Sequence, residues 1–339
     1  MPTLASPLAA LRRALLAALF AGPAWGQTPP PAPALPVPAP AIAPQVADQG
    51  QQQPDEIEII AHLPGPALWR VSTPESELWI IGLAGPVPKR MTWDTRRVET
   101  ALQGARELII PPGASINVFD IAGLLLDPGH RYHYPGGQTL RGAMSADERQ
   151  KFEAAAAAVG QDPAHYDHWR PIVTAIALLA DAQKHDALNP EGPQKALMHL
   201  AQAKSVPTRR LGNYGFGELA RALNSGGPNA ADLCLAMVVD LIPRLPALSE
   251  RMGGAWAKGD VAATREVRAQ ITSDRCFTAS PGLQALQDRQ ASDWAKGLAQ
   301  TLQKPGKTVL AIDMESLTRP GGLLEQLKAQ GLEVTGRAY

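Results

Sequence analysis

Two carboxylates that follow an apolar run near the C-terminal end are the first candidates for chemistry. Residues 308–313 (TVLAID) are typical of a buried strand, and Asp313 and Glu315 lie where it ends. Ligands of α/β proteins commonly bind beyond the carboxyl ends of strands. With Arg289 or Arg319 nearby, the two carboxylates are a candidate polar pocket. The alternative interpretation is a solvated loop with ordinary ion pairs.

Two histidine pairs have a spacing that permits metal binding. His130 and His133, and likewise His165 and His168, are three residues apart, which on a helix places both rings on one face. The first pair lies between Asp-Pro-Gly and Pro-Gly-Gly, so it is expected in a loop. The second pair directly precedes a helix start. Ordinary packed or surface histidines are therefore the favoured interpretation.

Other patterns that carry chemistry are missing from the sequence. There is no G-x-S-x-G, no H-E-x-x-H and no glycine loop that could cradle a phosphate. Residues 212–217 (GNYGFG) are rich in glycine but lack a following Lys-Ser/Thr. Lys and Arg together number 32, as do Asp and Glu. This balance, with no basic stripe, disfavours binding to nucleic acid or to an anionic membrane.

The N-terminal residues predict export. Residues 1–26 contain two arginines, a short apolar core and small residues before Gln27, as in a cleavable signal peptide. An uncleaved anchor is the alternative. Residues 27–54 are rich in Pro, Ala and Gln and are expected to be an extended tether or a passive leader. Residues 55–339 form the predicted domain, without a membrane-spanning segment, and the location is periplasmic or secreted.

The chain contains only two cysteines, Cys234 and Cys276, which are not in a C-x-x-C spacing. In an oxidising compartment such a pair predicts a disulfide rather than a metal site. A redox-active thiol is the alternative.

The elements that must position these residues alternate between strands and helices. A hairpin (residues 67–72 and 77–82), a helix (94–106) and a strand (107–110) form the first module. A helix (283–303), a strand (308–313), a second helix (321–330) and a strand (332–335) form the last. The middle predicts five helices, the first starting at a capping box (145–148), with a strand at 206–211. We expect an α/β (α+β) fold whose central mixed sheet consists of two related β-α-β halves, with a helical insertion between them.

Four stretches resemble the TraB/GumN family, which belongs with the Tiki-type metalloproteases and the erythromycin-esterase-like proteins. Residues 66–93 resemble its opening segment, with a tryptophan-bearing strand and a second strand that ends in G-x-x-H. Residues 107–110 resemble a strand that ends on an acidic residue, and 197–211 a segment that ends in L-E-T. Residues 308–334 resemble the closing segment with a second G-x-x-H. The resemblance covers most of residues 66–335 and implies a metal-dependent hydrolase.

This chain departs from the family pattern at each of those side chains. The first histidine position is Gly85, the first acidic position Pro111, the L-E-T position Gly212 and the second histidine position Ser316. Glycine and proline side chains cannot ligate a metal. We therefore expect no metal, no cofactor and no catalytic residue of the family type.

The resulting hypothesis is a pseudoenzyme. We expect a non-catalytic TraB/GumN-like protein of the cell envelope that binds an envelope protein or a small ligand. The alternative is a metal-dependent hydrolase or protease whose site is rebuilt from Asp313, Glu315 and the histidines. A role in polysaccharide export is a third interpretation, suggested only by the family name.

Overall fold

A computed structural model of the 339-residue chain describes residues 65–115, 132–215, 218, 221–222, 225–271 and 280–336. The predicted signal peptide and tether lie outside the described residues.

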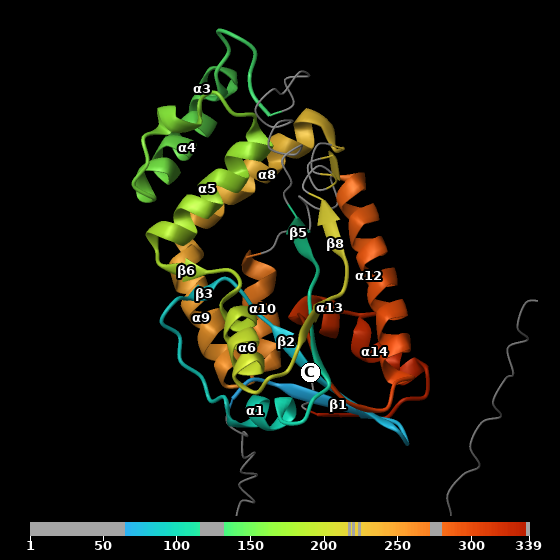
Figure 1. Ribbon diagram of the computed structural model, residues 1–339. Helices are drawn as coiled ribbons and strands as arrows, with labels where there is room; N and C mark the ends of the chain where they lie inside the picture. Colours follow the sequence, from blue (N-terminus) through green and yellow to red (C-terminus); the bar gives the residue numbers. More distant parts are fainter. Residues whose placement is uncertain are drawn as a thin grey trace, which may run out of the picture. The chain divides into compact units, whose positions relative to one another are not determined.

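The described part contains a six-stranded mixed sheet, which lies in the lower part of the view in Figure 1. Its strand order is β10-β1-β2-β9-β4-β7. The strands are β1 (Leu68–Ser72), β2 (Ser76–Leu83), β4 (Glu107–Ile110), β7 (Thr208–Arg210), β9 (Gly306–Asp313) and β10 (Val334–Gly336). The sheet therefore combines strands from both ends of the sequence, with β9 inserted between β2 and β4.

Four strands of the sheet run parallel to one another, so their carboxyl ends lie on the same side. β2 pairs in parallel with β9, and Leu83 lies opposite Asp313 at their carboxyl ends. β9 also pairs in parallel with β4, and β4 with β7. β1 joins β2 through an antiparallel hairpin, in which Thr73 N–H donates to the Ser76 carbonyl at 2.9 Å. The carboxyl ends of β2, β9, β4 and β7 consequently lie along the same edge.

Two prolines interrupt the pairing of β4 with β7. Ile110 lies opposite Arg210, and the pairing resumes with Gly113 opposite Asn213 in the same register. Pro111 and Pro112 lie in the gap, and proline has no backbone N–H to donate to a ladder. The strands β5 (Gly113–Ser115) and β8 (Asn213–Gly215) form a separate two-stranded sheet.

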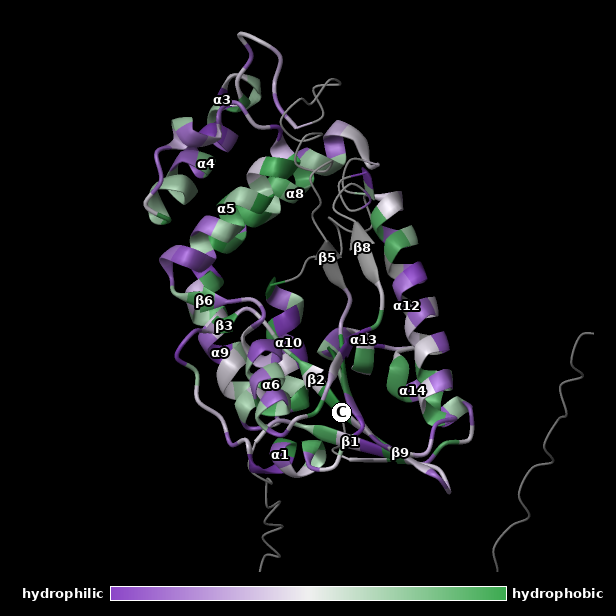
Figure 2. Ribbon diagram, viewed as in Figure 1, coloured by the Kyte–Doolittle hydropathy of each residue, from purple (hydrophilic) through white to green (hydrophobic). Residues whose placement is uncertain are grey.

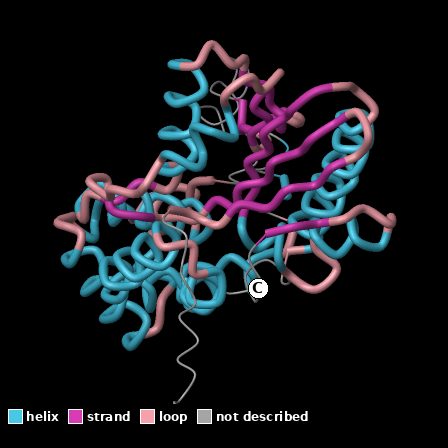
Figure 3. The backbone as a smooth tube through the Cα atoms, turned by 90° about the horizontal axis from the view of Figure 1, so that it is seen from below, coloured by secondary structure: helices cyan, strands magenta, loops and turns pink. Residues whose placement is uncertain are grey.

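Helices pack on both sides of the sheet. β9 and β4 have continuous buried runs, so neither face of these strands is solvated. The helices α1 (Arg96–Leu102) and α6 (Gly192–Ala203) pack against β9 and β4, and α12 (Pro281–Leu302) and α14 (Leu323–Ala329) against β2 and β10. Figure 3 shows the strands side by side between helical layers.

At the amino end of the β4–β7 pair, Glu107, the first residue of β4, forms an ion pair. Arg209 Nε donates to Glu107 Oε2 at 2.7 Å, and Arg209 Nη2 to Glu107 Oε1 at 3.2 Å. These hydrogen bonds lower the pKa of Glu107 below its usual value. This carboxylate is thus held by a two-pronged guanidinium contact.

The helical insertion lies between β4 and β9 in the sequence. Its helices are α3 (Leu140–Ala143), α4 (Ala146–Ala158), α5 (Pro171–His185), α8 (Gly227–Leu241), α9 (Leu245–Ala257) and α10 (Val261–Ile271), in addition to α6. α5 and α8 run side by side (Figures 1 and 2). A buried hydrogen bond from Trp256 Nε1 of α9 to the Gly82 carbonyl, at 2.6 Å, joins this region to β2.

The mixed α/β fold is confirmed, and several predicted elements have the expected positions. The capping box is present, with Ser145 and Glu148 exchanging hydrogen bonds at the start of α4. Two predictions need correction. Residues 314–320, expected as a loop, begin with the short helix α13 (Met314–Thr318), and α10 was not predicted. Among the described helices, none has the length and hydropathy required of a membrane span.

Candidate functional site

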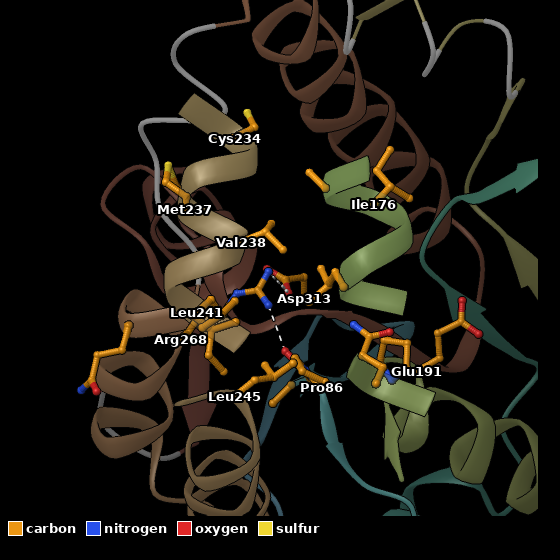
Figure 4. Close-up of a pocket in the computed structure, with 18 of the residues that line it drawn as sticks. Pro86, Ile176, Glu191, Cys234, Met237, Val238, Leu241, Leu245, Arg268 and Asp313 are labelled. Atoms are coloured by element: carbon orange, nitrogen blue, oxygen red, sulfur yellow. Dashed lines mark hydrogen bonds and ion pairs between the residues drawn. The ribbon is translucent and has the colours of Figure 1, made fainter. Parts of the chain in front are cut away.

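A pocket of about 630 Å³ opens at the carboxyl ends of β2, β4 and β9 (Figure 4). Gly85 follows β2, Pro111 follows β4 and Asp313 is the last residue of β9, and all three line it. The family resemblance assigned four positions to ligands, and the sheet brings two of them, Gly85 and Pro111, to this pocket. Asp313, the first residue of the second motif, lies there as well.

The walls of the pocket are mainly apolar and come from the helical insertion. One side is formed by α5 and the start of α6, and the other by α8 and the start of α9 (Figure 4). The apolar wall residues include Ile172, Ile176, Leu179, Val238, Leu241 and Leu245. Ile176 is 52% exposed, although it is a large apolar residue. Such a volume and lining are typical of small-molecule sites.

Arg268 of α10 lies between the two strand ends. Its Nη1 donates to the Gly85 carbonyl at 3.0 Å, and its Nη2 lies 3.8 Å from Asp313 Oδ2 (Figure 4). Its Nε is buried and has no hydrogen-bond partner within the described part of the chain. A guanidinium, which is always charged, thus connects the loop after β2 with the end of β9.

Asp313 also shapes the loop that follows it. Its Oδ1 accepts from Glu315 N–H at 3.0 Å and from Ser316 N–H at 3.2 Å, so Asp313 is the N-cap of α13. Glu315 and Ser316 are both exposed, and neither lines the pocket. Of the predicted polar pocket, only Asp313 lies at this site. Arg289 on α12 is instead paired with Glu218.

The loop after β2 is closed by packing. A Cβ on Gly85 would lie 2.3 Å from the Pro190 carbonyl oxygen, far inside any normal contact. A Cβ on Gly82 would lie 2.7 Å from the sulfur of Met314. The first motif therefore has no room for a side chain at Gly85 without displacement of the backbone before α6.

The other two assigned positions lie beside the pocket rather than in its lining. Gly212 follows β7 and has a φ of +88°, a backbone conformation that favours glycine. Its neighbour Leu211 donates its backbone N–H to the Ile110 carbonyl at 3.3 Å. Ser316 is in the first turn of α13. Neither Gly212 nor Ser316 is among the residues that line the pocket.

The described histidines of the two predicted pairs gather elsewhere, within an aromatic cluster. The rings of His133 and His168 stack with centroids 5.8 Å apart, and His165 lies edge-on to Trp169. Desolvation, together with His133 and His165, lowers the pKa of His168. His130 lies outside the described residues. Within the described residues, no group of three or more His, Cys, Asp or Glu side chains is arranged to hold a metal.

One cysteine of the predicted pair lies at the pocket. Cys234 on α8 is buried, lines the pocket and is not a free thiol. Cys276 lies outside the described residues, so its pairing with Cys234 stays a prediction.

Sequence reasoning missed Arg268, the residue that connects the two motif loops. Its helix has apolar residues at helical spacing, with Val261, Thr264 and Val267 buried. That spacing is typical of a helix, although this helix was not predicted, and it does not indicate which charged residue faces the strand ends. The side-chain contact with Gly85 spans 183 residues of sequence, and no local pattern encodes it.

The domain is thus a mixed α/β sheet with three parallel strand ends at one pocket, and a large helical insertion forms the pocket walls. The model of the TraB/PrgY/gumN family matches residues 67–336, and the chain belongs to this family. No curated protein and no solved structure was found to match it.

Proposed function

We propose that this chain is an exported, non-catalytic member of its family that binds a small ligand in the pocket at the ends of β2 and β9. The observation that carries the proposal is the position of Arg268. Its guanidinium lies between the Gly85 carbonyl and the Asp313 carboxylate, between the two segments from which the family resemblance would draw its histidines.

A fixed positive charge at this position opposes metal binding. Two like charges a few ångströms apart repel each other, and the repulsion grows where the surroundings exclude water. Position 85 also has no space for a histidine, because of the Pro190 carbonyl. Both features favour a binding site over a hydrolytic metal site.

The pocket itself supports the binding role. It is concave and mainly apolar, and a few polar groups meet at its floor, which is the usual composition of a small-molecule site. The equal numbers of acidic and basic residues in the chain give no support to a nucleic-acid partner.

The two-sided origin of the site fits our view that the domain contains two related β-α-β halves. β2 and β9 are parallel neighbours that end opposite each other, at Leu83 and Asp313. The first G-x-x-H motif of the family lies at the end of β2, and the second lies at the end of β9. Related halves would account for the meeting of two similar strand ends at one pocket.

Export rests on residues 1–26, and its test is the N-terminus of the protein recovered from the envelope fraction of expressing cells. Cleavage before Gln27 is the expected result. An intact N-terminus in that fraction would instead indicate the uncleaved anchor, and absence of the protein from the fraction would overturn export. The Cys234–Cys276 disulfide belongs to the same proposal. Titration of the unfolded protein without reductant should find no free thiol.

The metal content of the purified protein tests the non-catalytic role. The mature chain, purified without chelator and equilibrated with Zn²⁺ or Mn²⁺, is expected to retain well below one metal equivalent by elemental analysis. A stoichiometric metal that is lost in Asp313→Asn or His133→Ala would instead support the rebuilt hydrolase.

Binding can be tested with an apolar fluorescent dye whose emission increases in a dry site. We expect the mature chain to bind it, and Ile176→Trp to weaken binding, because the larger ring occupies part of the pocket. Leu233→Trp is the matched control, since Leu233 is also exposed and also lies in this helical pair, but does not line the pocket. Equal binding by both variants would contradict the proposal.

A further inference from the structure

The apolar part of the pocket has the form of a groove between two helices. α5 contributes Ile172, Ile176 and Leu179, and α8 contributes Met237, Val238 and Leu241. Within each helix these residues include pairs three or four positions apart, such as Ile172 with Ile176 and Val238 with Leu241, and such pairs share one face of the helix as a stripe. Figure 4 shows the Ile176 side chain and those of the α8 stripe on opposite sides of the pocket. An unbranched aliphatic chain fits two such facing stripes.

The charges of the pocket argue against a charged ligand. Among the described residues that line it, two are positive and three are negative: Arg244, Arg268, Glu191, Asp240 and Asp313. At the floor, one group of each sign lies side by side, since Arg268 Nη2 is 3.8 Å from Asp313 Oδ2. A carboxylate placed here meets Asp313, and an ammonium group meets Arg268.

The same two groups leave one donor and one acceptor facing each other. At 3.8 Å, Arg268 Nη2 and Asp313 Oδ2 are too far apart for a direct hydrogen bond. The other polar atoms of the two side chains are less suited to a ligand, because Arg268 Nη1 donates to the Gly85 carbonyl and Asp313 Oδ1 accepts two backbone N–H groups. The remaining atom, Arg268 Nε, is buried. A ligand that both accepts and donates is the match for this arrangement.

We infer that the pocket binds an uncharged aliphatic amide, with its chain between α5 and α8 and its amide group at Arg268 and Asp313. The amide carbonyl accepts a hydrogen bond from Arg268, and the amide N–H donates one to Asp313. This inference rests on the proposed binding function and adds the class of ligand to it.

A set of probes with one tail and three head groups tests the inference. Decanamide, decanoate and decylammonium are titrated into the mature chain by calorimetry at neutral pH. Decanamide is expected to bind about tenfold more tightly than either ion, the difference that one charge-assisted hydrogen bond produces.

Asp313→Asn provides the decisive variant, because asparagine keeps the N-cap of α13 while the charge is lost. We expect the preference for decanamide over decanoate to fall at least threefold. Glu315→Gln is the matched control, since it removes a neighbouring carboxylate that does not line the pocket, and it should leave the preference unchanged. Arg268→Met keeps the apolar stem and should weaken decanamide about tenfold.

The outcomes separate this inference from the proposed function. If decanoate binds as tightly as decanamide, or if Asp313→Asn leaves the preference unchanged, the amide assignment is wrong while the binding function stands. If no probe binds, and the apolar dye does not bind either, the proposed function itself fails.

Discussion

The ends of β2 and β9 are neighbours in the sheet, but they differ in the space that they leave for a side chain. The segment after β2 is packed on the backbone before α6, so that Gly85 touches the Pro190 carbonyl. The segment after β9 turns into a short helix whose second and third residues, Glu315 and Ser316, are exposed. One end is closed around glycine, and the other is open to side chains of any size.

The two positions that correspond to the histidines of the family pattern therefore differ in what a substitution requires. At Ser316 the side chain is exposed and space is available. At Gly85 the Pro190 carbonyl leaves no space for a side chain, and Arg268 donates to the carbonyl of Gly85 itself. Placing a histidine at the open end is feasible, whereas at the closed end it requires the backbone to move.

The largest expected effect comes from adding a side chain at the closed end. Gly85→Ala should lower the free energy of unfolding by about 3 kcal/mol, because its Cβ overlaps the Pro190 carbonyl. Ser316→His at the open end should change it by less than about 0.5 kcal/mol. Urea unfolding of the mature chain measures both values.

Gly254→Ala is the control for the glycine substitution itself. Gly254 lies within α9, and a methyl group added there would meet no atom of the described residues within 4 Å. Alanine at this position should therefore be neutral or stabilising by up to about 1 kcal/mol. If Gly85→Ala is tolerated as well as Gly254→Ala, the closed and open ends are equivalent and the comparison fails.

A smaller effect is expected from Trp256, whose side chain donates a hydrogen bond to the backbone just before the closed end, at Gly82. Trp256→Phe removes the buried hydrogen bond to the Gly82 carbonyl and should cost about 2 kcal/mol. Trp93 packs edge-on against the same ring and is the matched position, because Trp93→Phe keeps an aromatic contact and removes no bond to β2. Equal losses in thermal unfolding would show that ring volume, not the hydrogen bond, matters.

The stability of the open end is expected to depend on Asp313, the N-cap of α13. Asp313→Ala removes the acceptor of two backbone N–H groups and should cost about 1 kcal/mol. Asp313→Asn retains the cap and should cost much less, which keeps it usable in ligand titrations. A loss in Asp313→Asn as large as in Asp313→Ala, measured by urea unfolding, would mean that the contact with Arg268 rather than the cap stabilises this end.

The smallest effect concerns the amino edge of the same sheet, where a carboxylate is paired directly. The lowered pKa of Glu107 means that its ion pair stabilises the fold above the pKa of the unfolded chain, and that this contribution is lost as pH falls through the folded pKa. Glu107→Gln should cost about 0.5 kcal/mol at pH 7, with the difference from the unsubstituted chain shrinking below about pH 4. Unfolding curves at pH 7 and about pH 3.5 measure it, and a constant difference would contradict the assignment.

Local signals predicted most of the fold. Ser145 and Glu148 form the predicted capping box, and the predicted hairpin matches β1 and β2. The order of the sheet was not predictable, because the insertion of β9 between β2 and β4 depends on pairing between strands from opposite ends of the domain sequence. Helix α13 was missed because its five residues are too few to show a period, although Asp313 two positions before Glu315 is a capping signal.

For the site, the sequence identified the strand ends but not their surroundings. The family resemblance singled out Gly85 and Pro111, and the strand pattern singled out Asp313; the structure puts all three at one pocket. Arg289, chosen for its charge, lies in an ion pair with Glu218 on another element. The sequence of a helix indicates where a charged residue lies along it. The residue with which that charge pairs depends on tertiary packing.

The paired prolines after β4 have a consequence for how this domain opens. Because Pro111 and Pro112 donate nothing, the strand pairs on either side share a register but no continuous chain of hydrogen bonds. Proteins open locally in cooperative units rather than everywhere at once. Amide exchange in the β5–β8 pair should therefore be uncoupled from exchange in β4, so that this pair can open while the six-stranded sheet stays intact.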